Sequence, residues 1–280
     1  MYCSPLMQGI DVFKRKVLTT PLRDVPWREA HAIGIAPNPY YTLVAEIMLQ
    51  QTQVERVAPK YTAFITRFPT TEILAAASLH DVLTAWQGLG YNRRAIMLQR
   101  CAQTVTSLDS FPHDEKALQQ LPGIGPYTAA AVAAFAFDQP TIVIETNIRT
   151  ALIHAFFQDK ESVTDKELAP LLAELITNVP SPCEWYNKLM DYGAIIKREH
   201  GNLSRKSVMY AKQSSFKGSD REIRGAVLRE VLTQPYGRKI LYKKLLPLCK
   251  DTARISKVID GMVKEGIIVD DGKVHVSRKS

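Results

Sequence analysis

Two glutamates, Glu46 and Glu145, have surroundings that could support acid–base chemistry. Glu46 lies within the apolar run 44–48, and burial in such a run favours the protonated form of a carboxyl, which could then deliver a proton. Glu145 precedes a helix that we expect to begin near Asn147, where the helix dipole also stabilises an acid. Without further context, a structural role is the favoured interpretation of each residue. Glu46 would then be an exposed helix residue, and Glu145 would be an acid that stabilises the start of a helix.

A glycine-containing turn, Leu121–Gly125, separates two expected helices at 114–120 and 126–137. Its glycines allow a positive φ and a close approach of the backbone to a ligand. The free N–H groups at the start of the second helix favour an anion. A DNA backbone phosphate fits such a site without any reading of base sequence. An ordinary turn between two helices is the alternative, but the full string 121–129, LPGIGPYTA, favours a DNA-binding hairpin.

The elements around these residues are expected to be helical. Apolar residues recur at helical spacing, proline and glycine interrupt them, and alternating stretches are few, so residues 1–200 are predicted to be all-α. The expected helices cover residues 39–52, 54–68, 80–87, 93–107, 114–120, 126–137, 147–157, 165–177 and 184–198. The segment 69–72 is predicted to be a stop followed by a new helix start.

Beyond this helical region, residues 201–219 are rich in Ser, Lys and Gly and are predicted to be a basic linker. Residues 220–280 contain three helical patterns, at 221–232, 240–249 and 252–265. They are followed by two short apolar runs joined by Asp270-Asp271-Gly272, a sequence typical of a tight hairpin turn. Three helices and a hairpin predict a small winged-helix-like domain that binds DNA or protein.

Charge is distributed unevenly along the chain. Residues 197–280 contain 20 Lys and Arg against 9 Asp and Glu, while residues 1–196 contain 16 against 19. A polyanion such as DNA is the natural partner for this basic region, although a solvated surface is equally compatible with charge alone. No apolar run is long enough for a membrane span and no signal peptide is recognisable, so a cytoplasmic, nucleoid-associated monomer is expected.

Several segments, in order along the chain, resemble the helix-hairpin-helix DNA glycosylase superfamily. Within it, the chain is most similar to the A/G-mismatch adenine glycosylases (MutY-like), over roughly residues 20–200. The matching segments are Pro26-Trp27-Arg28, the run 45–54 (AEIMLQQTQV), WQGLGY at 86–91, LPGIGPYTA at 121–129, IETNIR at 144–149 and LMDYGA at 189–194. The resemblance implies an all-α fold of two helical subdomains, with the helix-hairpin-helix at about 114–137.

Two departures from the family pattern change what the resemblance implies. The family usually carries four cysteines after the LMDYGA segment, and these bind a 4Fe–4S cluster. Here Lys197 occupies the first of those positions, and Cys3, Cys101, Cys183 and Cys249 are far apart, so no cofactor, no metal and no iron–sulfur cluster is expected. The family's C-terminal domain for 8-oxoguanine is also not recognisable, which leaves the opposite-base preference open.

The resemblance also assigns catalytic roles. Glu46 corresponds to the general acid that protonates the departing base. Glu145 replaces the family's catalytic aspartate with a side chain one methylene longer, and its carboxylate would offset the charge that develops at C1′. Tyr127 and Asn147 correspond to polar residues that orient the carboxylates and water. Because bifunctional relatives have a lysine at position 127, Tyr127 predicts a monofunctional enzyme.

The same comparison suggests how DNA is held. Gln51 and Tyr91 resemble residues that wedge into the duplex when the base is flipped out. Trp27, Arg28 and Gln50 are candidates for the base pocket or its edge, although core packing explains Trp27 nearly as well. The candidate contacts to the DNA backbone are Gly123, Gly125, Arg93 and Arg149, together with a looser group made of Arg94, Lys197, Arg198, Arg205 and Lys206.

The sequence therefore predicts a monofunctional DNA glycosylase of base excision repair. The expected partner is double-stranded DNA with a mismatched or oxidised base pair, and the expected target is adenine opposite guanine or 8-oxoguanine. A T/G- or U/G-mismatch glycosylase of the same fold is one alternative. A non-catalytic DNA-binding protein is the other, but such a protein should have lost one of the two glutamates or the residues that support them.

Overall fold

The computed structural model describes residues 5–28, 37–212 and 214–277, and these are mostly helical. The chain forms two compact units. The first contains residues 1–43, 113–120 and 124–212, and the second contains residues 44–112, 121–123 and 213–280. Within the described residues, no helix combines the length and the apolar character needed to cross a membrane.

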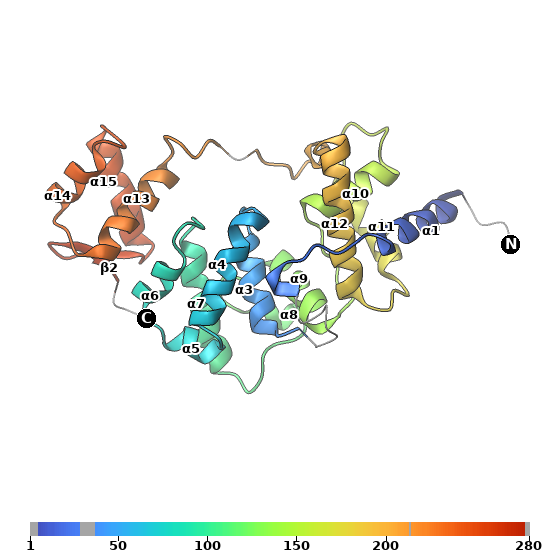
Figure 1. The fold of residues 1–280 in the computed structure, drawn as a ribbon, viewed down its shortest axis with the longest axis horizontal. Helices are drawn as coiled ribbons and strands as arrows, with labels where there is room; N and C mark the ends of the chain where they lie inside the picture. Colours follow the sequence, from blue (N-terminus) through green and yellow to red (C-terminus); the bar gives the residue numbers. More distant parts are fainter. Residues whose placement is uncertain (1–4, 29–36, 213, 278–280) are drawn as a thin grey trace. The chain divides into compact units, whose positions relative to one another are not determined.

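The first unit is built around α9, an alanine-rich helix that is apolar on every side and therefore buried along most of its length. The helices α10 and α12 pack side by side in this unit (Figure 1), and Ile148, Leu152 and Tyr186 are fully buried in its core. The elements of this unit are α1 (Pro5–Leu18), η1 (Pro26–Arg28), α8 (Glu115–Leu118), α9 (Pro126–Phe137), α10 (Thr146–Phe156), α11 (Asp165–Ile176), α12 (Pro182–His200) and η2 (Leu203–Lys206).

The second unit contains a group of helices packed on large buried side chains. The ring of Phe64 lies 5.8 Å from that of Trp86, edge to face, and both side chains are fully buried. Side-chain caps fix two helix starts, since the hydroxyls of Thr70 and Ser78 accept hydrogen bonds from backbone N–H groups. The elements are α3 (Pro39–Leu49, of which the last six residues belong here), α4 (Val54–Arg67), α5 (Thr71–Ala76), α6 (Leu79–Ala85) and α7 (Arg93–Thr106).

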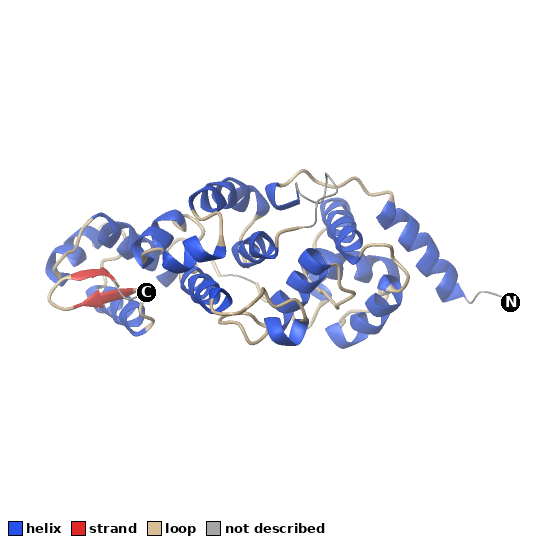
Figure 2. Cartoon of the chain, turned by 90° about the horizontal axis from the view of Figure 1, so that it is seen from below, coloured by secondary structure: helices blue, strands red, loops and turns tan. Residues whose placement is uncertain are grey.

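The C-terminal part of the second unit has the expected three helices and hairpin, shown with its two short strands in Figure 2. The elements are α13 (Asp220–Thr233), α14 (Arg238–Leu245), α15 (Thr252–Lys264), β1 (Ile268–Asp270) and β2 (Val274–Val276). The strands are antiparallel, with Ile268 opposite Val276, and Gly272 has a φ of 103° in the turn between them. We call residues 214–277 the C-terminal module.

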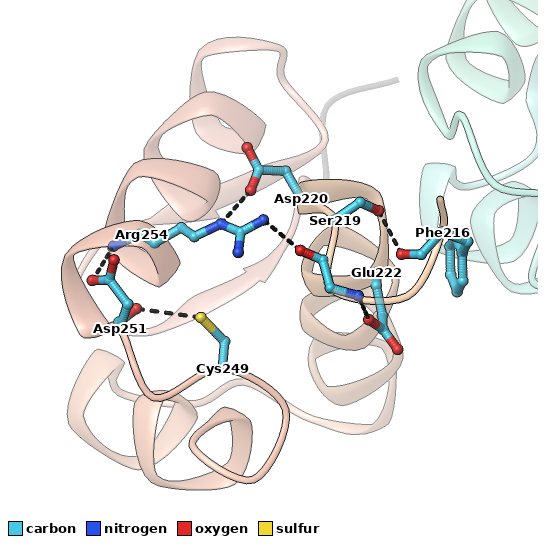
Figure 3. A network of polar contacts seen from close by, with 8 residues as sticks. Phe216, Ser219, Asp220, Glu222, Cys249, Asp251 and Arg254 are labelled. Carbon is cyan, nitrogen blue, oxygen red and sulfur yellow. Dashed lines mark hydrogen bonds and ion pairs between the residues drawn. The ribbon is translucent and has the colours of Figure 1, made fainter. Parts of the chain in front are cut away.

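A polar network joins the start of α13 to the start of α15 in this module (Figure 3). The Arg254 guanidinium donates to the Asp220 carboxylate at 2.6 Å and to the Gly218 carbonyl at 2.8 Å. The Asp251 carboxylate accepts from the Arg254 N–H at 3.0 Å and so caps α15. These contacts fix the first turns of both helices relative to each other.

The helices expected from the sequence are present, with ends that differ by a few residues. The all-α helix-hairpin-helix fold is confirmed, and α9 has the bounds that the sequence predicts. The helix α1 was not anticipated, although Ile10, Phe13 and Val17 have helical spacing and are buried in the core.

The segment expected to be a linker, residues 201–219, is partly folded. Its first residues form η2, and Ser204 and Ser207 are buried. Ser207 forms a bridge with Val163, whose N–H donates to the Lys206 carbonyl at 2.9 Å. A polar composition predicts a linker, but here residues 201–212 belong to the first unit, and two of their small serines are buried in it.

Candidate active site

The expected hairpin is present between α8 and α9. The Asp114 carboxylate caps α8, and Gly125 precedes Pro126, which begins α9 without needing an N–H partner. Gly123 has a φ of 78°, and a Cβ at this position would lie 2.5 Å from the Met97 Cβ. Gly123 and Gly125 are both exposed, so the turn offers its backbone to solvent. This geometry is compatible with a phosphate contact, which stays a prediction.

Glu145 is held in one orientation at the start of α10. Its Oε1 accepts hydrogen bonds from the N–H groups of Asn147 and Ile148, both at 2.8 Å. Burial raises the pKa of this carboxyl, and the two backbone hydrogen bonds and the positive charges of Arg149 and Lys197 only partly oppose that effect. A half-buried carboxylate fixed in this way can face developing positive charge without having to reorganise.

Charged and polar side chains surround this carboxylate within the first unit. Arg149 forms a bidentate ion pair with Asp165, with Nε–Oδ1 2.8 Å and Nη2–Oδ2 2.7 Å. Any phosphate contact by Arg149 would therefore have to share the guanidinium with Asp165. Tyr127, 38% exposed in the first turn of α9, is close enough to Arg149 to contribute to its raised pKa. Tyr127, Glu145, Asn147 and Arg149 thus form one cluster.

Arg28 has a structural role that the sequence did not reveal. Its Nη1 donates at 2.6 Å to the Asp191 carboxylate, which is almost fully buried and also accepts from the Arg23 backbone and guanidinium. Two arginines therefore neutralise Asp191 inside the first unit and tie η1 to α12. Trp27, the neighbouring candidate for the base pocket, is half-buried. The signal for Asp191 was its place in the LMDYGA segment.

Glu46 lies in the second unit on α3, where residues 43–48 are all buried. Its own exposed fraction is 9%, and the apolar neighbours Val44, Ala45, Ile47 and Met48 are 0–3% exposed. The expectation of burial is therefore met, and the interpretation as an exposed helix glutamate is wrong. Because Glu46 and Glu145 belong to different units, their convergence on one nucleotide stays a prediction.

Arg94 organises the two loops that carry the candidate wedge residues. Its guanidinium donates to the carbonyls of Ile47 and Gln50 at 2.7 and 2.6 Å, and to those of Leu89 and Gly90 at 3.1 and 3.3 Å. It therefore satisfies carbonyls at the end of α3 and joins loop 50–53 to loop 87–92. Burial lowers the Arg94 pKa to about 10, so the side chain stays charged at neutral pH. Arg94 also lines the cleft of the second unit, so any phosphate contact by Arg94 would have to share its guanidinium with these carbonyls, and that contact stays a prediction.

Gln51 and Tyr91 both have left-handed backbones, with φ of 55° and 46°. Such conformations are uncommon for residues other than glycine and tend to occur at functional sites. Both residues are exposed and, with Gln50, Arg93 and Gly123, they line a cleft of the second unit. The structure therefore brings these five predicted DNA-binding residues together, although their DNA contacts stay predictions.

The three cysteines that the structure describes lie in three different segments of the chain. Cys101 in α7 and Cys183 in α12 are buried, and burial raises the pKa of each thiol to about 12, so both are protonated. Cys249 follows α14, and Cys3 lies outside the described residues. Within the described part of the chain, no three His, Cys, Asp or Glu side chains are grouped to hold a metal ion.

Comparison with known proteins places this site in a family. Residues 44–177 match the HhH-GPD superfamily of base excision DNA repair proteins. The adenine DNA glycosylase of Mycolicibacterium smegmatis is 36% identical over 274 residues, an alignment that covers 87% of this chain and 88% of that protein.

The chain belongs to the HhH-GPD superfamily of base excision DNA repair proteins. The adenine DNA glycosylase of Mycobacterium tuberculosis is also similar, with 34% identity over 74% of this chain and 73% of that protein. Among solved structures, a thermostable thymine-DNA glycosylase aligns with a TM-score of 0.56 and 28% identity, over 68% of this chain and 88% of that one. Membership of the superfamily confirms the expected enzyme class, a DNA glycosylase of base excision repair.

Proposed function

We propose that this glycosylase is monofunctional and removes adenine mispaired with guanine or 8-oxoguanine. The observation that carries the reaction type is the Glu145 carboxylate, which is half-buried, accepts hydrogen bonds from two backbone N–H groups and has a raised pKa. The choice of adenine is supported by the names of the relatives in two mycobacterial species.

In the proposed reaction, Glu46 donates its proton to N7 of the flipped-out adenine. The C1′–N9 bond then breaks, its electron pair leaves with the base, and the Glu145 carboxylate stabilises the positive charge at C1′. Water adds to C1′ and gives its extra proton to a carboxylate, which leaves an abasic site. Asn147 and Tyr127 position the carboxylate and the water, while Tyr127 lacks the amine needed for a Schiff base.

The proposal requires no iron–sulfur cluster. Two of the cysteines, Cys101 and Cys183, are buried, protonated and placed on α7 and α12 in different units. The chemistry described above uses only proton transfer and electrostatic stabilisation, which need no redox centre. Iron analysis and the absorption spectrum of the purified protein test this point.

The target base is tested with duplexes that contain A·8-oxoguanine, A·G, T·G or U·G, each incubated with the full chain and then cleaved with alkali. We expect strand breaks at adenine and none at thymine or uracil. Glu46→Gln should bind the mismatched duplex but fail to release adenine. Release of adenine by that variant would remove Glu46 as the acid, and a covalent adduct after borohydride treatment would contradict the monofunctional assignment.

A second candidate is a glycosylase for thymine or uracil opposite guanine. The observation in its favour is the structural similarity to a thymine-DNA glycosylase, at 28% identity and a TM-score of 0.56. Breaks at T·G or U·G, with A·G and A·8-oxoguanine left intact, would select this candidate over adenine excision.

A further inference from the structure

The cleft that contains Gln51 and Tyr91 has a second wall, formed by α13 of the C-terminal module. Arg221, Arg224 and Arg229 of α13 all line this cleft. The opposite side adds Arg56, Arg93 and Arg94, while Glu265 is the one acidic residue in the lining that the structure describes. The cleft is therefore strongly basic.

The arginines of the cleft differ in how far they are neutralised. Arg224 forms a bidentate ion pair with Glu265, and Arg94 donates hydrogen bonds to backbone carbonyls. Among the residues that the structure describes, Arg93, Arg221 and Arg229 have no ion pair with a carboxylate. Arg93 and Arg229 are also exposed, so they can neutralise an external anion.

Arg221 connects the two walls. Its Nη1 donates to the Tyr91 hydroxyl at 3.0 Å, and its guanidinium lies 5.7 Å from the centre of the Tyr91 ring. The same guanidinium donates to the Ser214 carbonyl at 2.6 Å. This second contact fixes the start of the C-terminal module beside loop 87–92, which contains Tyr91. The exposed ring of Phe216 also lines the cleft, so aromatic faces for base stacking lie among the cations.

Arginines on other parts of the module are already paired. Arg254 of α15 pairs with Asp220 (Figure 3), and Arg238 of α14 pairs with both Asp260 and Asp270. In a helix-turn-helix module the later, recognition helix usually contacts DNA, which here would be α15. The arginines that line the cleft without an ion pair to a carboxylate include two of α13, Arg221 and Arg229, and this placement instead favours α13 as the helix that contacts a polyanion.

We propose that α13 is a DNA-binding wall, and that Arg221 and Arg229 contact backbone phosphates of the duplex beside the point where Gln51 and Tyr91 enter it. The proposal rests on the proposed function, because it places the mismatched duplex in this cleft.

The plot of log K against log salt concentration has a negative slope, and each lost phosphate contact should reduce the magnitude of that slope by about 0.9. Removal of both arginines should therefore reduce the magnitude by about 1.8. The ratio of wild-type affinity to variant affinity should then fall roughly tenfold between 50 and 200 mM salt.

The test uses the full chain and a duplex that contains an abasic-site analogue opposite guanine, which cannot be cleaved by a glycosylase. The variant Arg221→Gln/Arg229→Gln is compared with Lys239→Gln/Lys257→Gln, which removes two exposed charges from the same module outside the cleft. We expect weaker binding and a lower slope for the arginine pair and neither change for the lysine pair. An unchanged slope for the arginine pair, or an equal loss for the lysine pair, would overturn the proposal.

Two further measurements separate the possible failures. Arg229→Lys should keep the wild-type slope and Arg229→Gln should not; since Arg229 is exposed, neither should affect folding. If Arg229→Gln also kept that slope, the proposed phosphate contact would be wrong even if the double variant failed to fold. Base excision by the wild-type chain is measured in parallel on the mismatch duplexes. A wild-type chain that removes no base contradicts the proposed function. The comparison of salt slopes tests the phosphate contacts independently of that result.

Discussion

Gly193 of α12 lies directly against the backbone of Asn147 at the start of α10. A Cβ built on Gly193 would lie 2.0 Å from the Asn147 carbonyl oxygen and 3.0 Å from its Cβ. Backbone cannot move aside as a flexible side chain can. The close approach of α12 therefore determines where α10 begins, and with it the position of the Glu145 carboxylate that caps that helix.

Gly193→Ala should consequently displace the start of α10 and lower the free energy of unfolding by about 3 kcal/mol, as overpacking of a core does. Excision should fall with it, because Glu145 and Asn147 move together. Urea unfolding and single-turnover excision measure the two effects. Gly225→Ala is the control, since it has open space in α13 and should stabilise the helix by roughly 0.5–1 kcal/mol. Equal stability of wild type and Gly193→Ala would disprove the contact.

The sequence predicts much of the helical architecture because the information is local. Spacing of apolar residues and capping residues such as Asp114 and Ser78 define where helices occur and begin. The contact of Gly193 with Asn147 depends on two helices that are far apart in the chain. Apart from the place of Gly193 in the LMDYGA segment, the local sequence does not show that Gly193 is tightly packed while Gly225 has open space around it.

The roles of the arginines were the hardest to predict. Arg93 and Arg94 are adjacent and identical, and the sequence suggested a phosphate contact for both. The helix turns one guanidinium outward and the other into the carbonyls of two loops. Arg28 and Asp191 are a similar case, because a buried ion pair between distant segments leaves no periodic signal.

Replacement of these two neighbours by the same residue should separate their roles. Arg94→Met leaves several partly buried carbonyls without a donor at once and should cost roughly 3 kcal/mol of unfolding free energy. Arg93→Met removes an exposed charge and should leave stability within about 0.5 kcal/mol of wild type. Urea unfolding of both variants checks this. A similar loss in both, or in neither, would mean that Arg94 does not support the loops.

The raised pKa of Glu145 has a consequence for activity. If the carboxylate form is required, excision should decline as the pH falls through a value above the ordinary 4.5 of glutamate. Glu145→Gln should be inactive over the whole pH range, because an amide cannot offset the charge at C1′. The rate of adenine release, measured from pH 4 to 8 in single turnovers, tests both statements. A Gln variant that retained wild-type rates would exclude Glu145 from the chemistry.

The same shift predicts how stability depends on pH. A buried carboxyl with a raised pKa favours the folded state when protonated, so its contribution is present below the unfolded pKa and is lost as the pH rises through the folded value. The Glu145→Gln variant has no carboxyl at this position, so it does not lose stability in this way as the pH rises. Its stability relative to wild type should therefore be greater at pH 8 than at pH 4, as measured by urea unfolding at both values. A smaller difference at pH 8 would mean that hydrogen bonding outweighs burial at this position.

The left-handed backbone of Gln51 should impose a stability cost that serves DNA binding. Gln51→Gly removes the steric cost of φ 55°, so the unfolding free energy should rise by about 1 kcal/mol. The same change removes the side chain expected to wedge into the duplex, so kcat/KM should fall about tenfold, equivalent to roughly 1.4 kcal/mol. Stability and activity should therefore change in opposite directions.

Asn178→Gly provides the matched control for this prediction. Asn178 also has a left-handed backbone, with φ 62°, but it is an exposed residue after α11 and lies outside the candidate site. It should gain stability in the same way, by an amount up to about 1 kcal/mol, while excision stays unchanged. If both variants lost activity, the effect would be general. If Gln51→Gly kept full activity, the side chain would have no part in opening the duplex, and the strain at position 51 would need another explanation.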